Sequence, residues 1–164
     1  MSEPPRVRVL LLSPRDRLLL IKYRNTQRSG ADSPIWQMAG GGRDPGESVE
    51  QTAVREVFEE TGISIARPGP VVWYGEDAER SGDWGIVYRE HFILARAATE
   101  RLDNSRWTAH ELDQILALRW WTLEEIRASA ERLYPPGLAN LLAPILDGIL
   151  PLTPLTLPRI GITS

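Results

Sequence analysis

Apolar residues cluster into short runs near the start of the chain, and these runs have the character of β-strands. The first two are Arg6–Pro14 and Arg17–Asn25, and the residues between them ("SPRD", 13–16) have the composition of a turn. Apolar runs separated by turn residues predict a β-hairpin. A third, shorter strand is predicted at Ile35–Gly40 ("IWQMAG"), after a polar loop over residues 26–34.

The second half of the chain shows more strand patterns and then helical ones. Strands are predicted within residues 70–80 and 87–97, joined by a turn or flexible loop, and a short one within 118–122 ("LRWWT"). Helices are predicted over 123–133 and 135–150, the second with proline in its first turn. Strands, one central helix, more strands and then helices indicate an α+β or mixed α/β sandwich.

The central helix is marked by signals at both ends. Ser48 is a good N-cap, Gln51 completes a capping box, and Gly62 stands where a C′ glycine ends a helix. The loop ahead of it is rich in glycine, so its backbone can approach a ligand closely: Gly40, Gly41, Gly42 and Gly46.

Negative charge is concentrated on one face of this helix. At about 100° per residue, three glutamates share a narrow face: Glu56, Glu59 and Glu60. Val54 and Phe58 project to roughly the opposite side, with Val57 beside them, and this face is predicted to pack in a core. Like charges at this spacing destabilise a helix by about 0.2–0.5 kcal/mol per pair. The cluster is therefore either a solvated acidic surface or a site where a cation offsets the repulsion.

The spacing around these glutamates resembles the Nudix box. From Gly41 the chain reads Gly, five residues, Glu47, seven residues and then "REVFEETGI" (Arg55–Ile63). This matches every specified position of Gly-x5-Glu-x7-Arg-Glu-U-x-Glu-Glu-x-Gly-U, where U is apolar. Such a match arises by chance with a probability on the order of 10⁻⁸ per start position. The preceding "IWQMAGG" also looks like the family, although Ala39 replaces its usual proline.

The resemblance implies a Nudix fold, an α/β/α sandwich with a mixed sheet. It also implies hydrolysis of the phosphoanhydride of a nucleoside diphosphate linked to another group, with Mg²⁺ or Mn²⁺ as cofactor. By resemblance the metal ligands are Glu56, Glu59 and Glu60. Arg55 would orient a carboxylate, and Glu47 would brace the loop against the helix. The glycines Gly40, Gly41 and Gly42 would approach the bound group. Metal-assisted attack of water relies on positioning and electrostatics, which fits these residues.

The general base is expected to be a box glutamate or a carboxylate from a separate loop. Glu111, in the polar passage 105–114, is the preferred extra carboxylate, because a mobile loop there could reach over the site. The alternative is an exposed residue in the first turn of a helix. Glu90 is interpreted as a strand residue paired across the sheet, and His91 and His110 as structural or exposed side chains.

Further substrate contacts would come from aromatic and basic residues near loops. The candidates for stacking on a base are Trp36, Trp84 and Trp107. The candidates for phosphate contacts are Arg24, Arg28 and Arg43. A core role for the tryptophans and a surface role for the arginines are the alternatives.

Composition limits the partners. The 164-residue chain has a net charge of −3, so no global positive field draws it to nucleic acid or anionic lipid. We expect a small nucleotide as partner, no large nucleic acid, no membrane contact and a cytoplasmic location, and a homodimer is left open. The chain has no cysteine, which excludes disulfides. The isopentenyl diphosphate isomerase branch of the Nudix fold is an alternative that the missing cysteine argues against, because the chemistry of that branch uses one.

One Nudix-type domain is expected over residues 1–150, followed by an extended proline-rich tail over 151–164. A non-catalytic nucleotide-binding or regulatory Nudix module is the alternative function. Such relatives usually lose box glutamates, whereas this chain retains all of them. Motifs that mark subgroups with particular substrates are mostly absent, so the sequence does not select a substrate.

Overall fold

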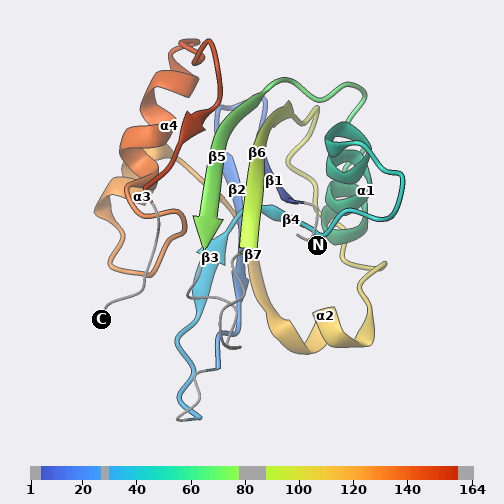
Figure 1. The fold of residues 1–164 in the computed structure, drawn as a ribbon. Coiled ribbons are helices and arrows are strands. Elements are labelled where there is room, and N and C mark those ends of the chain that lie inside the picture. Colours follow the sequence, from blue (N-terminus) through green and yellow to red (C-terminus); the bar gives the residue numbers. More distant parts are fainter. Residues whose placement is uncertain (1–4, 27–29, 78–87, 159–164) are drawn as a thin grey trace.

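The strands form a mixed sheet in the computed structural model, which describes residues 5–26, 30–77 and 88–158 (Figure 1). The strand order is β3-β2-β1-β6-β5-β8, with β4 also paired to β1 and β7 to β2. The strands are β1 (Arg6–Leu12), β2 (Leu18–Tyr23), β3 (Ile35–Gln37), β4 (Ala39–Gly41), β5 (Val71–Asp77), β6 (Tyr88–Arg96), β7 (Ile115–Trp121) and β8 (Leu155–Thr156). The helices are α1 (Val49–Thr61), α2 (Ala109–Gln114), α3 (Leu123–Ala128) and α4 (Leu138–Leu146).

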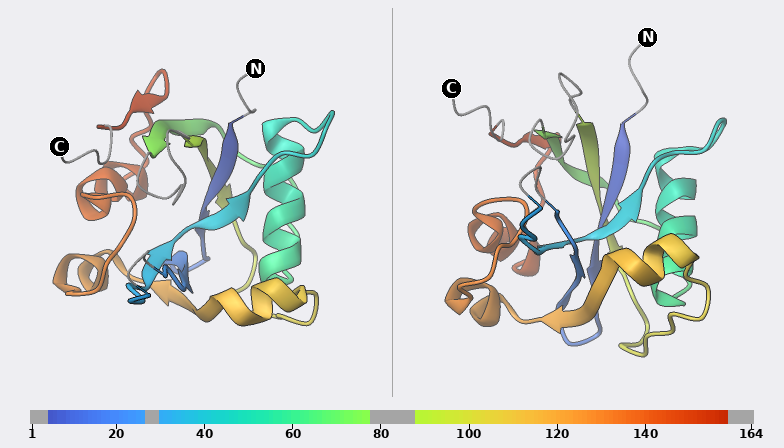
Figure 2. Two further views of the ribbon diagram at one scale, coloured as in Figure 1. Left: turned by 60° about the horizontal axis from the view of Figure 1, so that its bottom comes forward. Right: turned by 90° about the horizontal axis from the view of Figure 1, so that it is seen from below.

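Two layers of helix cover the sheet. Figure 1 shows α1 on one face, with α3 and α4 on the other. Figure 2 shows α2 leading into β7 at one end of the molecule. Each face of the sheet has its own apolar cluster, one under α1 and one under α3 and α4. The predicted fold class, an α/β/α sandwich with a mixed sheet, is confirmed.

The central strand β1 divides its side chains between these two clusters. Val7, Val9 and Leu11 belong to the cluster under α1, whereas Leu10 and Leu12 belong to the cluster under α3 and α4. This division follows from the alternation of side chains along a strand. The two arginines of β1, at even positions, therefore share the face of the second cluster.

The two halves of the sheet diverge at β1. This strand pairs with β6 in parallel along its length, and with β4 from Val7↔Gly41 to Val9↔Ala39. It pairs with β2 only at Leu12↔Leu18, beside the turn. The predicted hairpin thus exists at its turn, but its strands separate because β4 takes the place of β2. At Met38 the chain passes from β3, which pairs with β2, to β4, which pairs with β1.

The C-terminal helices are shorter than the sequence predicted. α3 ends at Ala128 because the following chain runs along β3: Trp36 N donates to Arg132 O at 2.9 Å, and Tyr134 N donates to Trp36 O at 2.8 Å. α4 begins after Gly137, whose left-handed backbone (φ 74°) cannot continue a helix toward Pro135.

Residues 155–157 pack onto the sheet. β8 pairs with β5 in parallel at Trp73↔Leu155 and Tyr74↔Thr156. Leu157 N donates to Tyr74 O at 2.8 Å, and the Leu157 side chain is buried in the cluster under α3 and α4. In the described part of the chain, no helix is both long and apolar enough to cross a membrane.

Candidate active site

Helix α1 has the predicted caps. Ser48 Oγ accepts from Gln51 N at 3.1 Å, and Gln51 Oε1 accepts from Ser48 N at 2.9 Å. Gly62 is left-handed (φ 76°), and its N–H donates to Phe58 O. The capping box and the C-terminal glycine are both confirmed, and they fix where the glutamate-bearing helix starts and stops.

The predicted core face of α1 is correct for Val57, which is buried, and for Val54, which packs against the cluster under α1, but it was wrong for Phe58. Phe58 is 36% exposed, and the guanidinium carbon of Arg106 lies 4.2 Å from its ring centroid. The buried residues are Thr52, Ala53, Val57, Glu60 and Thr61. α1 is rotated so that one glutamate points into the protein, because β4 and Tyr23 supply hydrogen bonds for its carboxylate.

Arg55 connects the glycine-rich loop to the helix. Its Nε and Nη2 donate to the two oxygens of Glu47, both at 2.9 Å, and Nη2 also donates to Gly42 O at 3.0 Å. Its Nη1 donates to Glu56 Oε1 at 3.0 Å and to Glu59 Oε2 at 3.3 Å. These are the contacts expected of a residue that orients carboxylates, and of a Glu47 that braces the loop.

Glu47 holds the loop conformation as well. Its Oε1 accepts from Asp44 N at 2.8 Å and from Thr52 Oγ1 at 3.3 Å. The hydrogen bonds from Arg55 are the largest influence on this carboxyl and lower the pKa of Glu47 to about 2. Arg43, a predicted phosphate contact, donates instead to Glu47 O at 2.7 and 3.2 Å.

Glu60 is the buried member of the cluster, with 2% of its surface exposed. One oxygen accepts from Gly40 N at 2.8 Å, and the other accepts from the Tyr23 hydroxyl. Its backbone carbonyl accepts from Trp107 Nε1 at 2.8 Å. Burial, aided by the charge of Glu56, raises the pKa of Glu60 to about 8.

Glu56 and Glu59 are progressively more exposed, with side-chain exposures of 14% and 43%. Burial raises the pKa of Glu56, and the negative charge of Glu59 adds to this effect. The exposure of the three glutamates therefore increases in the order Glu60, Glu56, Glu59, from the interior toward solvent.

Glycines are required where the loop meets these carboxylates. Gly40 has φ 151°, and a Cβ there would lie 1.9 Å from Val7 O. A Cβ on Gly41 would lie 2.6 Å from Glu56 Oε1. A Cβ on Gly42 would meet nothing within 4 Å. The close approach of backbone to the acidic cluster therefore depends on Gly40 and Gly41.

The donor chemistry fits a hard divalent cation. Within residues 5–26, 30–77 and 88–158, no three His, Asp or Glu side chains already converge as a metal-holding group. The carboxylates of the box glutamates instead accept hydrogen bonds from Arg55, Tyr23 and Gly40. However, burial raises the pKa of both Glu56 and Glu60, and repulsion from Glu59 and from Glu56, respectively, adds to this effect, so a bound cation would favour the ionised form of each. Carboxylate oxygens are the ligands that Mg²⁺ and similar hard ions prefer in proteins.

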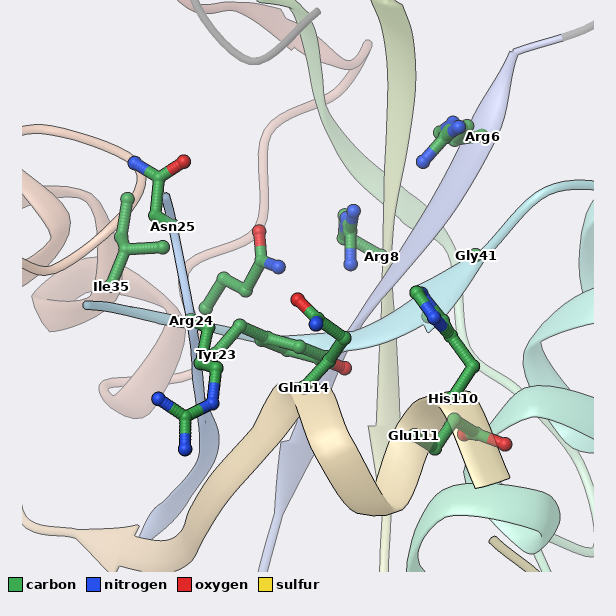
Figure 3. Close-up of a pocket in the computed structure, with 12 residues that line it drawn as sticks. Arg6, Arg8, Tyr23, Arg24, Asn25, Ile35, Gly41, His110, Glu111 and Gln114 are labelled. Carbon is green, nitrogen blue, oxygen red and sulfur yellow. The ribbon is translucent and has the colours of Figure 1, made fainter. Parts of the chain in front are cut away.

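A cavity of about 400 Å³ lies beside this cluster, where the two halves of the sheet diverge (Figure 3). Four predicted site residues line it, Arg24, Gly40, Gly41 and Glu111, and so does His110, which had been interpreted as structural or exposed. The remaining lining residues are Arg6, Arg8, Tyr23, Asn25, Ile35, Gln37 and Gln114. The sequence alone did not indicate this second set, because its members come from α2 and from within or just after separate strands, and they meet only in the folded protein. The one available signal was "RVRV" at the start of β1, where alternation places Arg6 and Arg8 on one face.

Glu111 lies on a short helix, so the prediction of a mobile loop was wrong. Thr108 caps α2, and Glu111 forms the capping box by accepting from Thr108 N at 3.1 Å. The capping box stabilises a helical turn in a passage whose polar composition had predicted a loop. Glu111 nevertheless lines the cavity from the α2 side (Figure 3).

Other candidates lie away from the cavity or outside the described residues. Trp36 is 5% exposed and packs edge-on against Trp121, with ring centroids 5.1 Å apart, so it is a core residue. Trp107 is half-buried against the cluster under α1, and its Nε1 donates to Glu60 O. His91 is half-buried beside Tyr74. The remaining two, Trp84 and Arg28, lie outside the described residues.

Comparisons with known proteins agree with this geometry. The NUDIX domain model matches residues 2–143. An RNA pyrophosphohydrolase of Sphingopyxis alaskensis is 38% identical over 110 residues, covering 61% of this chain and 68% of that protein. A putative 8-oxo-dGTP diphosphatase of Bacillus subtilis is 43% identical over 58 residues, covering 35% of this chain and 34% of that protein.

Solved structures share the fold. The NUDIX hydrolase from Nitrosomonas europaea superposes with a TM-score of 0.62 at 25% identity, covering 91% of this chain and 94% of that one. Nudix hydrolases generally use divalent metal ions, which agrees with the donor set described above. The complete box, the loop and helix that it builds, and a family match over residues 2–143 show that this chain belongs to the Nudix family of hydrolases.

Proposed function

We propose that this Nudix pyrophosphohydrolase cleaves the phosphoanhydride of a nucleoside diphosphate linked to another group. Water attacks one phosphorus, the bond to the bridging oxygen breaks, and a nucleoside monophosphate leaves together with phosphate or a phosphorylated group. The observation that carries the proposal is the position of Glu56 and Glu60 against Gly40 and Gly41, at the edge of a cavity lined by arginines.

The metal ligands in this proposal are Glu56, Glu59 and Glu60, with Mg²⁺ or Mn²⁺ as the ion. When bound, the ion neutralises phosphoryl charge and lowers the pKa of the attacking water. Arg55 keeps Glu56 and Glu59 on the same side of α1 through its Nη1. The Gly40 N–H and the Tyr23 hydroxyl fix the rotamer of Glu60. These contacts orient the ligands before substrate arrives.

Glu111 is our candidate for the base that takes a proton from the attacking water. Its position on the cavity wall supports this role, and its bond to Thr108 N fixes one of its oxygens. A box glutamate is the other candidate. A Glu111→Gln variant that lost turnover while still binding nucleotide would support Glu111, and one with unchanged turnover would assign the base to the box.

A hydrolysis screen tests the proposal. The substrates are nucleoside triphosphates including 8-oxo-dGTP, ADP-ribose, dinucleoside polyphosphates, nucleotide sugars and a 5′-triphosphorylated RNA oligonucleotide. The RNA is included because a relative 38% identical to this chain is named an RNA pyrophosphohydrolase. Each substrate is assayed with Mg²⁺, with Mn²⁺ and with chelator.

Two variants of α1 make the screen decisive. Glu60→Gln removes a proposed ligand, whereas Glu50→Gln changes an exposed glutamate on the same helix. We expect metal-dependent turnover in the wild type and the Glu50 variant, and a loss of at least about a hundredfold in the Glu60 variant. Turnover that survives chelator, or that Glu60→Gln leaves intact, would sink the proposed mechanism.

A further inference from the structure

Arg8 takes part in a buried polar network that the box does not explain. Its Nε donates to Glu90 Oε2 at 2.5 Å, across the parallel pair of β1 and β6. The other oxygen of Glu90 accepts from the Tyr134 hydroxyl at 2.9 Å. Arg8 and Glu90 are 3% and 0% exposed. Glu90 therefore binds the Arg8 guanidinium in the protein interior, and Tyr134 in turn binds Glu90.

Arg8 also holds the point where the chain crosses between the halves of the sheet. Its Nη1 donates to Met38 O at 3.3 Å, and Met38 lies between β3 and β4. A single side chain thus joins β1, β6 and the strand crossing that leads into the glycine-rich loop.

The same guanidinium lines the cavity. Arg8 is among the residues that line the cavity in Figure 3. Arg8 is the register partner of Gly40 across β1 and β4, and Gly40 N donates to Glu60 Oε1 at 2.8 Å. Arg8 therefore lies at the cavity wall, beside the strand whose backbone binds the acidic cluster.

Donor counting leaves room for a ligand. A guanidinium has five N–H donors. Within the described residues, two bonds from Arg8 to protein acceptors are formed, one to Glu90 and one to Met38. Three donors remain beside a cavity with space for an anion. The unused donors form part of the planar fork that suits phosphoryl oxygens.

Stability alone does not account for this pair. Replacing a buried ion pair by apolar residues of similar volume is often neutral or stabilising. The neighbours of Arg8 on the same face of β1, Leu10 and Leu12, are fully buried apolar residues. An apolar pair at 8 and 90 would thus satisfy the same face of the sheet. The charged pair supplies something that apolar residues do not, which is a fixed cation at the cavity wall.

We propose that Arg8 binds a phosphoryl oxygen of the substrate and that Glu90 and Tyr134 are positioning residues that fix its guanidinium. This inference rests on the proposed function and adds a substrate contact outside the Nudix box. It also gives Tyr134, in the connection between α3 and α4, an indirect role in substrate binding.

Four variants test the inference by separating KM from kcat. Arg8→Lys keeps the charge but loses the fork, and Tyr134→Phe removes only the hydroxyl. Glu90→Gln weakens the hold on Arg8. Arg8→Leu with Glu90→Leu removes the pair together, so that no buried charge is left alone. We expect KM to rise about tenfold to a hundredfold for Arg8→Lys and for the double variant, and less for Tyr134→Phe.

The melting temperature separates a binding role from a folding role. We expect the double leucine variant to stay folded and to melt only slightly below the wild type, because the Tyr134 hydroxyl loses its acceptor on Glu90, while its KM is raised. An unchanged KM in a folded double variant would overturn the inference. If the double variant does not fold, Arg8→Lys and Tyr134→Phe decide in the same way: a raised KM supports the inference, and an unchanged KM overturns it.

Arg96→Lys serves as the control, because Arg96 forms an exposed ion pair with Asp16, 3.0 Å long, at the far end of β6. We expect its KM to match that of the wild type. A wild-type protein that hydrolyses no substrate in the screen would sink the proposed function. A wild type that hydrolyses normally, with Arg8 variants that do the same, would sink only the inference about Arg8.

Discussion

Arg55 and Glu47 are joined by a two-pronged ion pair, with Nε and Nη2 of Arg55 each donating to a different oxygen of Glu47 at 2.9 Å. Glu47 belongs to the loop and Arg55 to the second turn of α1. The pair therefore fixes the distance and the angle between the two parts of the site. Because Arg55 also donates to Glu56 and Glu59, the same side chain fixes the positions of these two carboxylates relative to the loop.

Replacing Arg55 by lysine is expected to lower activity about a hundredfold. Lysine keeps the charge, but it cannot donate in parallel to two oxygens of Glu47 and still reach Gly42 O. Displacement of catalytic groups by about 1 Å is enough for a loss of this size. The measurement is kcat/KM on the best substrate from the screen. Activity within threefold of the wild type would show that the fork does not position the cluster.

The ion pair also predicts how stability responds to acid. The hydrogen bonds from Arg55 lower the pKa of Glu47 to about 2, below its ordinary value of 4.5. The unfolded chain therefore binds the proton more readily, and this contribution to stability is complete above about pH 4.5. It is lost as pH falls toward 2. Urea unfolding at pH 7 and pH 3 checks the expectation: Glu47→Gln is less stable than wild type at pH 7, and the difference shrinks at pH 3. A difference that stays constant with pH would contradict it.

Gly40→Ala is expected to destabilise the fold by about 3 kcal/mol and to abolish activity. The added Cβ would lie 1.9 Å from Val7 O, and φ of 151° is strained for any residue with a side chain. Gly42→Ala is the matched control two residues away, because its Cβ would meet nothing within 4 Å. Chemical denaturation of both variants gives the comparison. Similar stabilities for the two would mean that β4 can move away from β1 without penalty.

Glu60→Gln is expected to keep the metal-free fold and to lose the response to metal. Glutamine has the same shape, can accept from Gly40 N and can bond to the Tyr23 hydroxyl, so the melting temperature without metal changes little. A bound ion stabilises the folded state by mass action, in proportion to its affinity. Thermal melts in increasing Mg²⁺ or Mn²⁺ should show a rise for the wild type and for Glu50→Gln, but almost none for Glu60→Gln. An equal rise in all three proteins would place the metal elsewhere.

The parts of this structure that could be predicted from the sequence depend on neighbouring residues. The caps of α1 at Ser48 and Gly62 follow from side-chain chemistry within a few positions, and both were predicted. The Nudix box fixes the loop-helix unit in the same way, because Glu47 and Arg55 are only eight residues apart. The order of strands and helices predicted an α+β or mixed α/β sandwich, and the resemblance to the Nudix box implied its α/β/α form.

The parts that could not be predicted depend on contacts distant in sequence. Arg8 meets Glu90 across 82 positions, through a parallel pairing that no local pattern specifies. The burial of Glu60, and with it the exposure of Phe58, is set by Tyr23 and Gly40 rather than by the helix itself. Helical periodicity gives the angle between residues but not the direction in which the helix is turned.

The pairing of β8 with β5 has a consequence for any shortened version of this chain. β8 covers the backbone of β5 at Trp73 and Tyr74, and Leu157 covers part of the apolar cluster beneath. A chain cut at residue 150 would leave β5 as a bare outer strand next to exposed apolar surface, which is a template for pairing with a second molecule. Removal of the proline-rich end is thus expected to promote self-association and precipitation, even though the Nudix box is untouched.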